Sequence, residues 1–590
     1  MALQPTPTKN DDLALRSGDF RTLAEALDYA AQGQTGYNYY DLTGALKTRL
    51  PYSELRDRAQ TLALKLIPRF APGDRIAILA ETKPEFHILF FACQYAGLIP
   101  TPLPLPVSLG GKDGYVFQIR QMVENATARA VVCSPDLFDM LSEAIAPLGD
   151  VNCTTYEDFA RGEEAAAELR PLGPEDACYI QYSSGSTSAP KGVIGTQRSV
   201  TANIHGIIAH GLQVRSGDRA ISWLPLYHDM GLVGFALAPM MCQISVDYLA
   251  TSDFARRPML WLKLFSENRG TIAFSPSFGF ELCVRRTKSR NGYHDYDLSS
   301  WRVAGIGGDM VRADVLEQFA ETFAENGFRR STFLPSYGLA ESTLAATFTR
   351  LEDCIETDTI DIQYAAKSNR AQPATAFTPE SHRRSFAICG SALPGHEIEI
   401  RDENDRVLGE REIGRIMFRG PSVAPGYFDP NSESVLPEKS VEWLDTGDMG
   451  YLLDGQLVIT GRSKDLILSN GRNIWPQDIE WAVEKRDDIK QGAVAAFSIQ
   501  QEDGRDEIIT IVERRVSDAE ERRRLENEIN STIYSVVGAQ ARIVFVPPRS
   551  MVMTSSGKLS RAKVKQKFLN GEFDPPASPE PEKMAVMDAG

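Results

Sequence analysis

The 590-residue sequence lacks the usual marks of a metal-binding or nucleic-acid-binding protein. It has no Cys-x-x-Cys pair and no cluster of cysteine and histidine at metal-ligand spacing. We expect the eight cysteines to be reduced, mostly buried thiols of a cytoplasmic protein: Cys93, Cys133, Cys153, Cys178, Cys242, Cys283, Cys354 and Cys389. The net charge of −16 argues against nucleic acid as the main partner, because a surface that binds a phosphate backbone needs a basic balance.

Long apolar runs are also missing. Residues 1–12 are polar and contain prolines, unlike a signal peptide. The longest apolar segment, residues 86–98, runs into a series of four prolines at positions 100 to 106, so it is too short and too broken to cross a bilayer. We therefore predict a buried helix at this point, no stable membrane insertion, and a cytoplasmic location.

The pattern that is present through the first 350 residues alternates apolar, strand-like runs with helical segments. Residues 75–79 precede an expected helix at 84–97, and residues 130–133 precede one at about 136–146. This alternation predicts buried parallel strands in βα units. From about residue 386 to 460, short strands such as 397–400 and 414–418 lie between Gly, Pro, Asn and Asp turns, which predicts a small β-barrel or a twisted sheet.

After Arg462 the pattern returns to mixed α and β segments. Helices are expected at about 476–486 and 518–536, with strands at 492–497 and 508–512. Beyond Asn570 the sequence is rich in proline and glutamate without periodicity, which is typical of a disordered tail or a linker.

The predicted fold class is therefore α/β. We expect a large N-terminal domain, residues 1–462, of two βα-layered sheets plus the small β-barrel, followed by a smaller α+β C-terminal domain, residues 463–570, and a tail, residues 571–590.

Residues 182–192 (YSSGSTSAPKG) have the composition of a loop that binds phosphate. Glycines let the backbone approach an anion, the hydroxyl groups donate hydrogen bonds, and Lys191 adds positive charge. Most Ser/Gly runs are flexible linkers, but the strand-like entry and the Pro-Lys-Gly exit favour a phosphate loop. A Walker loop is excluded because, counted from Gly185, Pro190 occupies the second glycine position and Gly192 the hydroxyl position.

Six further segments accompany this loop: 223–231 (WLPLYHDMG), 307–310 (GGDM), 336–343 (SYGLAEST), 445–448 (DTGD), 461–467 (GRSKDLI) and 556–561 (SGKLSR). Together, and in this order, they resemble the adenylate-forming superfamily, which includes acyl-CoA synthetases, luciferases and the adenylation domains of peptide synthetases. The motifs extend from residue 182 to residue 561, so the resemblance covers nearly the whole chain.

The resemblance implies that a carboxylate is activated with ATP and Mg²⁺. Tyr337 would then lie against adenine, Asp448 would accept both ribose hydroxyls, and Arg462 would lie near the ribose and phosphate. Glu341 would bind Mg²⁺, together with Thr187. The remaining residues of the implied nucleotide site are Ser183, Ser184, Gly185, Ser186, Lys191, Gly307, Gly308, Asp309, Ser336 and Gly338.

Lys558, Glu341 and His228 are the candidate catalytic residues. A flexible ammonium such as that of Lys558 can reach both the incoming carboxylate and the α-phosphate; the alternative is a solvated lysine on a turn. The resemblance places Lys464 at a hinge about which a mobile C-terminal domain swings. It also assigns to the acyl pocket His228, Asp229, Met230, Gly231, Ser277 and Phe278.

Two features resemble one branch, the fatty acyl-AMP ligases, which pass acyl-adenylates to the phosphopantetheine arm of a carrier protein. Residues 227–231 and 276–283 resemble segments of that branch. The stretch between Glu341 and residue 389 is long enough to contain an insertion at about 351–375, the branch's hallmark, which is thought to hinder transfer to CoA. The alternative is a tolerated surface loop.

We therefore predict ATP-dependent activation of a medium- or long-chain fatty acid to acyl-adenylate with release of pyrophosphate, then acyl transfer to a holo acyl carrier protein of a polyketide, peptide-synthetase or lipid pathway. No phosphopantetheine attachment motif is visible in the C-terminal part, so the acceptor is separate or lost with a truncated tail. One alternative is a fatty acyl-CoA synthetase. Another is a non-catalytic nucleotide or acyl-adenylate sensor, against which intact Lys558, Glu341 and Asp448 argue.

An acidic carrier protein could dock on a group of arginines in the C-terminal domain, Arg514, Arg515, Arg522, Arg523 and Arg524. The interleaved Glu520 and Glu521 favour a charge-laced helix instead. We expect a monomer or a weak dimer, an expectation that no particular motif supports.

Overall fold

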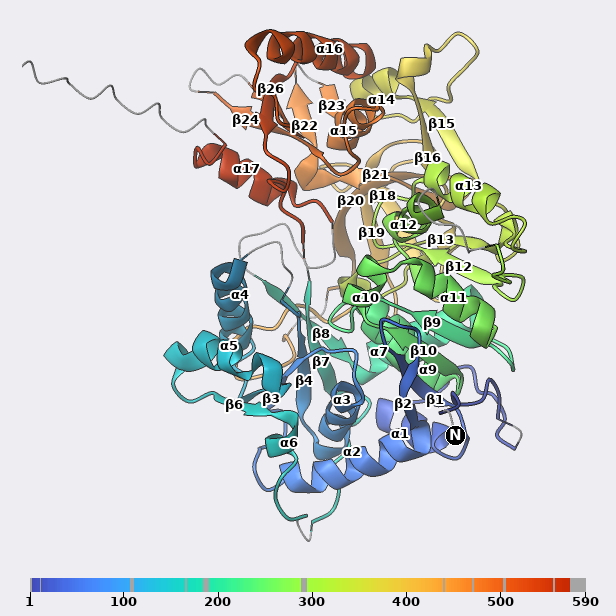
Figure 1. The fold of residues 1–590 in the computed structure, drawn as a ribbon, viewed down its shortest axis with the longest axis vertical. Helices are drawn as coiled ribbons and strands as arrows, with labels where there is room; N and C mark the ends of the chain where they lie inside the picture. The colour runs from blue at the N-terminus through green and yellow to red at the C-terminus, as the bar shows by residue number, and fades with distance from the viewer. Residues whose placement is uncertain are drawn as a thin grey trace, which may run out of the picture.

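The computed structural model describes residues 3–10, 12–106, 111–164, 167–183, 190–287, 294–438, 441–469, 472–501, 506–554 and 558–573 (Figure 1). Its largest sheet has nine strands in the order β17-β14-β13-β12-β11-β9-β10-β1-β2. The strands from β13 to β1 run parallel to their neighbours, as the βα pattern predicts, and antiparallel strands close both edges. The bounds are β1 Gly36–Tyr40, β2 Leu46–Pro51, β9 Arg219–Ser222, β10 Ser245–Leu249, β11 Ile272–Ser275, β12 Val303–Ile306, β13 Phe333–Tyr337, β14 Thr347–Phe348 and β17 Ser391–Ala392.

A second, fully parallel sheet has the order β4-β3-β5-β6. Its strands are β3 Arg75–Leu79, β4 Ile99–Leu103, β5 Ala130–Cys133 and β6 Asn152–Thr155. A hairpin of β7 (Ala177–Ser183) and β8 (Lys191–Thr196) packs beside β4 and carries the candidate phosphate loop between its strands.

Helices cover these sheets. In the first part of the chain they are α1 Leu23–Ala30, α2 Tyr52–Leu66, α3 Pro84–Ala96, α4 Gly111–Asn125, α5 Pro135–Ile145, α6 Tyr156–Phe159 and α7 Gln197–Gly206. Further along lie α8 Asp229–Gly231, α9 Ala238–Met241, α10 Thr251–Arg256, α11 Met259–Asn268, α12 Ser277–Thr287 and α13 Ala313–Thr322. Two segments are π-helical, η2 (Ile207–Gly211) and η3 (Leu232–Leu237).

Helix α3 illustrates how local sequence and burial agree. Pro84 occupies its first turn, where a missing N–H costs nothing, and Gly97 ends it in the left-handed region at φ 72°. Every residue of α3 except Glu85 is buried, which explains its nearly continuous apolar sequence. Helix α3 packs against α2 and lies between the two sheets (Figure 1).

Residues 397–462 form a four-stranded antiparallel sheet, β18-β19-β20-β21, in place of the expected small barrel over 386–460. Its strands are β18 Glu397–Arg401, β19 Gly414–Arg419, β20 Leu444–Leu453 and β21 Gln456–Arg462. The residues just before it belong elsewhere, because β16 (Arg383–Ala387) pairs with β15 (Thr357–Asp361) and β17 pairs with β14. The expected insertion at 351–375 therefore contains a strand, β15, and a helix, α14 (Ile362–Ser368).

The last part of the chain has its own buried cluster, formed by residues of β22 (Ile467–Ser469), β23 (Arg472–Ile474), α15 (Pro476–Glu484) and α16 (Ala519–Val537) together with a three-stranded sheet, β24-β25-β26. That sheet consists of β24 Val494–Gln500, β25 Asp506–Glu513 and β26 Arg542–Val546, and α17 (Arg561–Leu569) covers it from the other side. A mixed α/β chain with a large first part and a smaller second one is thus confirmed. The domain boundary after Arg462 stays a prediction.

Residues 574–590, most of the expected tail, lie outside the described residues. Six of the eight cysteines are buried, Cys153 is partly buried and Cys354 is exposed. Within the part of the chain that the structure describes, none of the helices combines the length and the apolar character needed to cross a bilayer.

Candidate functional site

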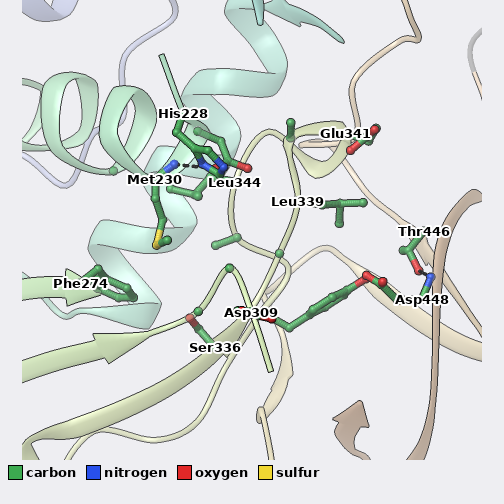
Figure 2. A pocket seen from close by; sticks show the side chains of 18 of the residues that line it. His228, Met230, Phe274, Asp309, Ser336, Leu339, Glu341, Leu344, Thr446 and Asp448 are labelled. Atoms are coloured by element: carbon green, nitrogen blue, oxygen red, sulfur yellow. Dashed lines mark hydrogen bonds and ion pairs between the residues drawn. The ribbon is translucent and has the colours of Figure 1, made fainter. Parts of the chain in front are cut away.

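A continuous cavity of about 640 Å³ lies where the large sheet, the β18–β21 sheet and the C-terminal part meet. Its floor includes the residues that follow the carboxyl ends of the parallel strands β12 and β13, where ligands of α/β sheets bind. Figure 2 shows its two sides: His228 and Met230 lie across from Asp448 and Thr446, with Ser336, Asp309 and Glu341 between them.

Three predicted residues meet at the polar end of the cavity. The Tyr337 hydroxyl donates a hydrogen bond of 2.8 Å to Asp448 Oδ2, and Arg462 Nε lies 3.5 Å from Asp448 Oδ1. Asp448 and Arg462 are cross-strand partners on β20 and β21, so the strand register fixes the pair. Burial raises the pKa of Asp448, and the Arg462 guanidinium opposes this. The result is a carboxylate with a phenol and a guanidinium at its two oxygens.

Lys558 reaches the cavity from the C-terminal part of the chain. Its backbone is held by Thr554, whose Oγ1 accepts the Lys558 N–H at 3.1 Å and whose N–H donates to the Lys558 carbonyl at 2.7 Å. A Cβ on Gly308, which adopts φ +79°, would lie 3.8 Å from Lys558 Nζ and 2.8 Å from Met230 Cε. Gly308 therefore leaves space for the Met230 methyl group, and its backbone passes close to the ammonium. Burial lowers the pKa of Lys558, while Asp309, Asp229 and Asp448 act in the opposite direction.

Glu341 lies in a short turn, η5 (Ala340–Ser342), directly after the Tyr337 strand. Its Oε1 accepts a hydrogen bond of 2.8 Å from the Tyr427 hydroxyl. The Lys191 ammonium lies 5.0 Å from the centre of the Tyr427 ring, so Tyr427 joins the expected metal ligand to the expected phosphate-loop lysine. Tyr427 is a site residue that no sequence motif marked.

His228 and Asp229 stand at the opposite end, where α8 begins. His228 Nδ1 lies 2.5 Å from Asp229 Oδ1. Burial raises the pKa of Asp229, but the charges of His228 and Lys558 outweigh it and hold that pKa below its ordinary value. The pair thus places charge at the boundary between the polar and apolar parts of the cavity.

Beyond His228 the cavity continues as an apolar arm, and Met230 is the one apolar residue of the predicted acyl pocket that lines it. The lining residues of the helical segment 229–242 recur at helical spacing, as Met230, Gly234, Ala238 and Cys242 do, so one face of it forms a wall. The opposite side consists of side chains from η2, β9, β11 and the chain around β14, including Ile208, Leu212, Ala220, Ile272, Phe274, Leu344 and Phe348. An arm of this composition accepts an apolar ligand tail.

The predicted residues divide into three groups. Those that line the cavity are Lys191, His228, Asp229, Met230, Gly307, Gly308, Asp309, Ser336, Tyr337, Gly338, Glu341, Asp448, Arg462, Lys464 and Lys558. Ser184, Gly185, Ser186 and Thr187 lie outside the described residues, as does the side chain of Ser183.

The third group, Gly231, Ser277 and Phe278, is absent from the cavity lining formed by the described ranges. Ser277 Oγ accepts the Arg312 N–H at 3.1 Å, and the Phe278 ring packs edge-on against Trp223 with 5.8 Å between centroids. A Cβ on Gly231 would lie 2.1 Å from the Pro225 carbonyl oxygen. These three residues support the neighbouring backbone, and the expected pocket wall is formed by other side chains.

Three of the five arginines in the group of the C-terminal part make contacts within the chain. Arg514 forms ion pairs with Asp488 and Glu521, Arg524 lies 3.8 Å from Glu528, and Arg522 lies over the Phe545 ring. These contacts favour the charge-laced helix over a docking surface.

Among the described residues, no group of three or more histidine, cysteine, aspartate or glutamate side chains could hold a metal ion. The donor set still fits Mg²⁺, which protein sites bind through one or two carboxylates while phosphates and water supply the other ligands. Glu341 is the carboxylate in a position to do so.

A family model described as AMP-binding enzyme matches residues 30–428. A protein of Caulobacter vibrioides named "Putative acyl-CoA synthetase" is 45% identical over 575 residues, covering 97% of this chain and 99% of its own. The medium-chain-fatty-acid–acyl-carrier-protein ligase JamA of Moorena producens is 29% identical over 582 residues, covering 94% of this chain and 96% of its own.

Among solved structures, one from a study of fatty acyl-adenylate ligases of E. coli and L. pneumophila superposes with a TM-score of 0.89. It is 42% identical and covers 95% of this chain and all of its own. Both the large sheets and the smaller C-terminal part therefore have counterparts in that structure.

Proposed function

The chain belongs to the AMP-binding enzyme family, and from this we propose that it activates a medium- or long-chain fatty acid with ATP and passes the acyl group to a carrier protein. In the first step a carboxylate oxygen bonds to the α-phosphorus of ATP, the bond to the pyrophosphate leaving group breaks, and acyl-adenylate forms. In the second, the phosphopantetheine thiol of a separate holo acyl carrier protein bonds to the acyl carbon and AMP leaves.

One observation carries the proposal: a single cavity joins the Tyr337–Asp448–Arg462 end, the Lys558 ammonium and an apolar arm beyond His228. A nucleotide can occupy the Tyr337–Asp448–Arg462 end and an acyl tail the apolar arm. The carboxylate of the acid and the α-phosphate of the nucleotide then meet beside Lys558. Two anions repel each other as they approach, so a cation fixed at that point stabilises the transition state. Lys558 acts by charge, in its protonated form.

The other polar side chains bind and orient. Asp448 accepts hydrogen bonds from the ribose hydroxyls, for which its two oxygens are suited, and the Tyr337 ring lies against adenine. Glu341, with Thr187, would hold a Mg²⁺ ion that offsets phosphate charge when bound. His228, fixed by Asp229, marks the carboxylate end of the acyl arm.

The choice of a carrier acceptor is supported by the insertion, which folds against the C-terminal part. Gln363 of α14 donates a hydrogen bond of 2.7 Å to the Val536 carbonyl at the end of α16, and Asn473 of β23 donates one of 2.8 Å to Asn369. Figure 1 shows α14 beside α16 and α15. Contacts of this kind hold the C-terminal part in its present arrangement, so the insertion is in a position to govern which thiol enters.

A second candidate, a fatty acyl-CoA synthetase, is favoured by the name of the Caulobacter relative. It shares the first half-reaction and differs in the acceptor alone. The two candidates are therefore separated by the acceptor and not by adenylate formation.

The deciding experiment incubates the chain with ATP and labelled fatty acids of graded length, adding nothing, CoA, holo acyl carrier protein or its apo form. We expect acyl-AMP without acceptor and acyl-carrier thioester with the holo form only. Accumulation of acyl-CoA as fast as acyl-carrier thioester would show that CoA, and not the carrier protein, is the acceptor. Absence of pyrophosphate release with every acid would overturn fatty-acid activation itself.

We predict that the rate of adenylate formation falls at both acidic and alkaline pH. Each fall should occur at a pH shifted from the ordinary pKa of the side chain that causes it. Burial lowers the pKa of Lys558, so its ammonium loses the proton at a lower pH than free lysine and the rate falls in that range. Burial raises the pKa of Asp448, so this carboxylate gains a proton at a higher pH than free aspartate, and ATP binding weakens there. Profiles of kcat/KM for ATP test both limbs; an alkaline limb that persists unchanged in K558Q would contradict the assignment to Lys558.

A further inference from the structure

The acyl arm proposed above has one helical wall, which comprises α8, η3 and α9, residues 229–241, and ends at Cys242. Met230, Phe235, Pro239 and Cys242 all line the arm from this segment. Its middle is π-helical: the Ala238 N–H donates to the Val233 carbonyl, five residues back. Figure 1 shows α9 beside β10 and β1, so the wall contacts the large sheet next to the arm.

The wall has an irregular backbone because of Pro239. Proline has no N–H, so the carbonyl of Phe235 cannot receive the hydrogen bond that residue 239 would donate in an α-helix. The Tyr248 hydroxyl of β10 donates to this carbonyl at 2.7 Å. The neighbouring Ala236 carbonyl accepts the Tyr37 hydroxyl of β1 at 2.5 Å. Two phenols therefore satisfy buried carbonyls that the helix leaves available.

A buried histidine orients Tyr248. The Tyr248 hydroxyl, which donates to the Phe235 carbonyl, also lies 3.3 Å from His87 Nε2. His87 Nδ1 lies 2.9 Å from the Tyr39 hydroxyl and 3.3 Å from the Lys83 carbonyl. These contacts connect Tyr39 through His87 and Tyr248 to the Phe235 carbonyl.

Burial and register make this chain of hydrogen bonds rigid. Tyr39 lies opposite Tyr248 in the parallel pair of β1 and β10, and Tyr37 lies on the same face of β1, two residues before. Tyr37, His87 and Tyr248 are each exposed by 1% or less. Burial lowers the pKa of His87 to about 3, so the imidazole stays neutral and keeps one donor and one acceptor nitrogen.

From this geometry we propose that Tyr248, supported by Tyr37 and His87, positions the helical wall and thereby sets how well the acyl arm accepts long chains. The proposal rests on the proposed function and names a property of the same cavity. Phe235 lies about 7 Å further along the helix than Met230. Butanoate, whose tail extends about 4 Å, stops short of that point, whereas dodecanoate passes it. These tyrosines are positioning residues, since they touch the wall and not the acyl chain.

The test compares Tyr248→Phe and Tyr37→Phe with wild type in adenylate formation from butanoate and from dodecanoate. We expect kcat/KM for dodecanoate to fall about tenfold, mainly through KM, because the wall shifts against a bound chain. For butanoate it should change by less than about twofold. Equal losses with both acids would overturn the proposal, because a general loss of folded protein lowers both alike.

A matched control is Tyr156→Phe. The Tyr156 hydroxyl also donates to a buried carbonyl, that of Leu79, at 2.6 Å, but Tyr156 lies in the second sheet's layer and not behind the wall. The Tyr156→Phe variant loses the same kind of hydrogen bond, so its stability should fall as in Tyr248→Phe. Its ratio of kcat/KM for dodecanoate to kcat/KM for butanoate should stay that of wild type. A shifted ratio in Tyr156→Phe would also contradict the proposal.

Amide hydrogen exchange provides a readout independent of activity. Peptides covering 232–242 should exchange faster in Tyr248→Phe than in wild type or Tyr156→Phe, because the Phe235 carbonyl has lost its partner. Unchanged exchange there would refute the positioning role even if the chain activated no fatty acid. If the wild type forms no adenylate from either acid, the proposed function is refuted. The exchange comparison then still tests whether Tyr248 positions the helical wall.

Discussion

Replacement of Lys558 by alanine should lower the rate of acyl-adenylate formation by about 10²–10³-fold, the range observed when one group that stabilises transition-state charge is removed. The ammonium lies beside Gly308, and the carboxylates of Asp309, Asp229 and Asp448 act on it. Lys464, Arg462 and Arg561 also line the cavity, but Arg462 is paired with Asp448, and Arg561 with Asp465 and Glu480. Pyrophosphate release at saturating ATP and fatty acid measures the effect.

The second half-reaction provides the control within the same protein. Lys558→Ala supplied with synthetic acyl-adenylate should still transfer the acyl group to its acceptor at close to the wild-type rate, because that step has no pyrophosphate charge to stabilise. Lys563→Ala, an exposed position on α17, should leave both half-reactions unchanged. Loss of both half-reactions in Lys558→Ala, or of adenylate formation in Lys563→Ala, would mean that general damage and not charge explains the result.

Much of the scaffold could be predicted from local sequence. The expected helix at 84–97 is α3, Pro84–Ala96, and the expected helix at 518–536 is α16, Ala519–Val537. Both have strong end signals: proline in the first turn of α3, Asp518 as N-cap of α16, and a left-handed glycine after each. Short strand-like runs between Gly, Pro, Asn and Asp turns likewise located β18 and β19.

The wall of the acyl arm could not be predicted in the same way. Residues 232–242 are apolar almost throughout, so no periodicity distinguishes a π-helical wall from an α-helix. The hydrogen bonds that complete it come from Tyr37 and Tyr248, far away in the chain. Phe278 illustrates the opposite case: motif resemblance placed it in the pocket, whereas its ring is committed to Trp223.

The insertion was visible in the sequence only as excess length. Its packing on the C-terminal part depends on contacts across the chain, such as the hydrogen bond from Gln363 to the Val536 carbonyl. The strand that pairs with it, β16, adds the ion pair between Arg384 and Asp478 of α15, with the Arg384 guanidinium over the Trp481 ring at 4.8 Å. Side chains of that kind have no local pattern. Their partners become evident only when β16 and α15 are placed side by side.

Removal of Arg561 should lower the free energy of unfolding by about 3 kcal/mol or more, which is the usual cost of leaving one partner of a buried ion pair alone. Arg561 holds both oxygens of Glu480, at 2.8 and 2.6 Å, and also Asp465 at 2.8 Å. Only 4% of the Glu480 side chain is exposed. In Arg561→Ala this carboxylate would be buried without a cation, and urea denaturation would measure the loss.

Two further variants separate charge from geometry at Arg561. Arg561→Lys keeps the charge but cannot hold both Glu480 oxygens in one plane, so its stability should fall between those of wild type and Arg561→Ala. The double variant Arg561→Met/Glu480→Gln removes the unpaired carboxylate and should recover most of the lost stability. A loss below about 1 kcal/mol in Arg561→Ala, the range of a surface ion pair, would show that solvent reaches Glu480 in the native protein.

The same variants test whether Arg561 also positions Lys558. Arg561 begins α17 just after Lys558 and joins that segment to α15 through Glu480 and to the expected hinge through Asp465. If this anchor fixes the ammonium, the double variant Arg561→Met/Glu480→Gln will be nearly as stable as wild type and still form adenylate slowly, because the segment carrying Lys558 is no longer held. Acyl transfer from synthetic acyl-adenylate should be less affected than adenylate formation. If the double variant regains adenylate formation along with stability, Arg561 contributes to folding alone, and Thr554 and the packing of α17 are sufficient to hold Lys558 in place.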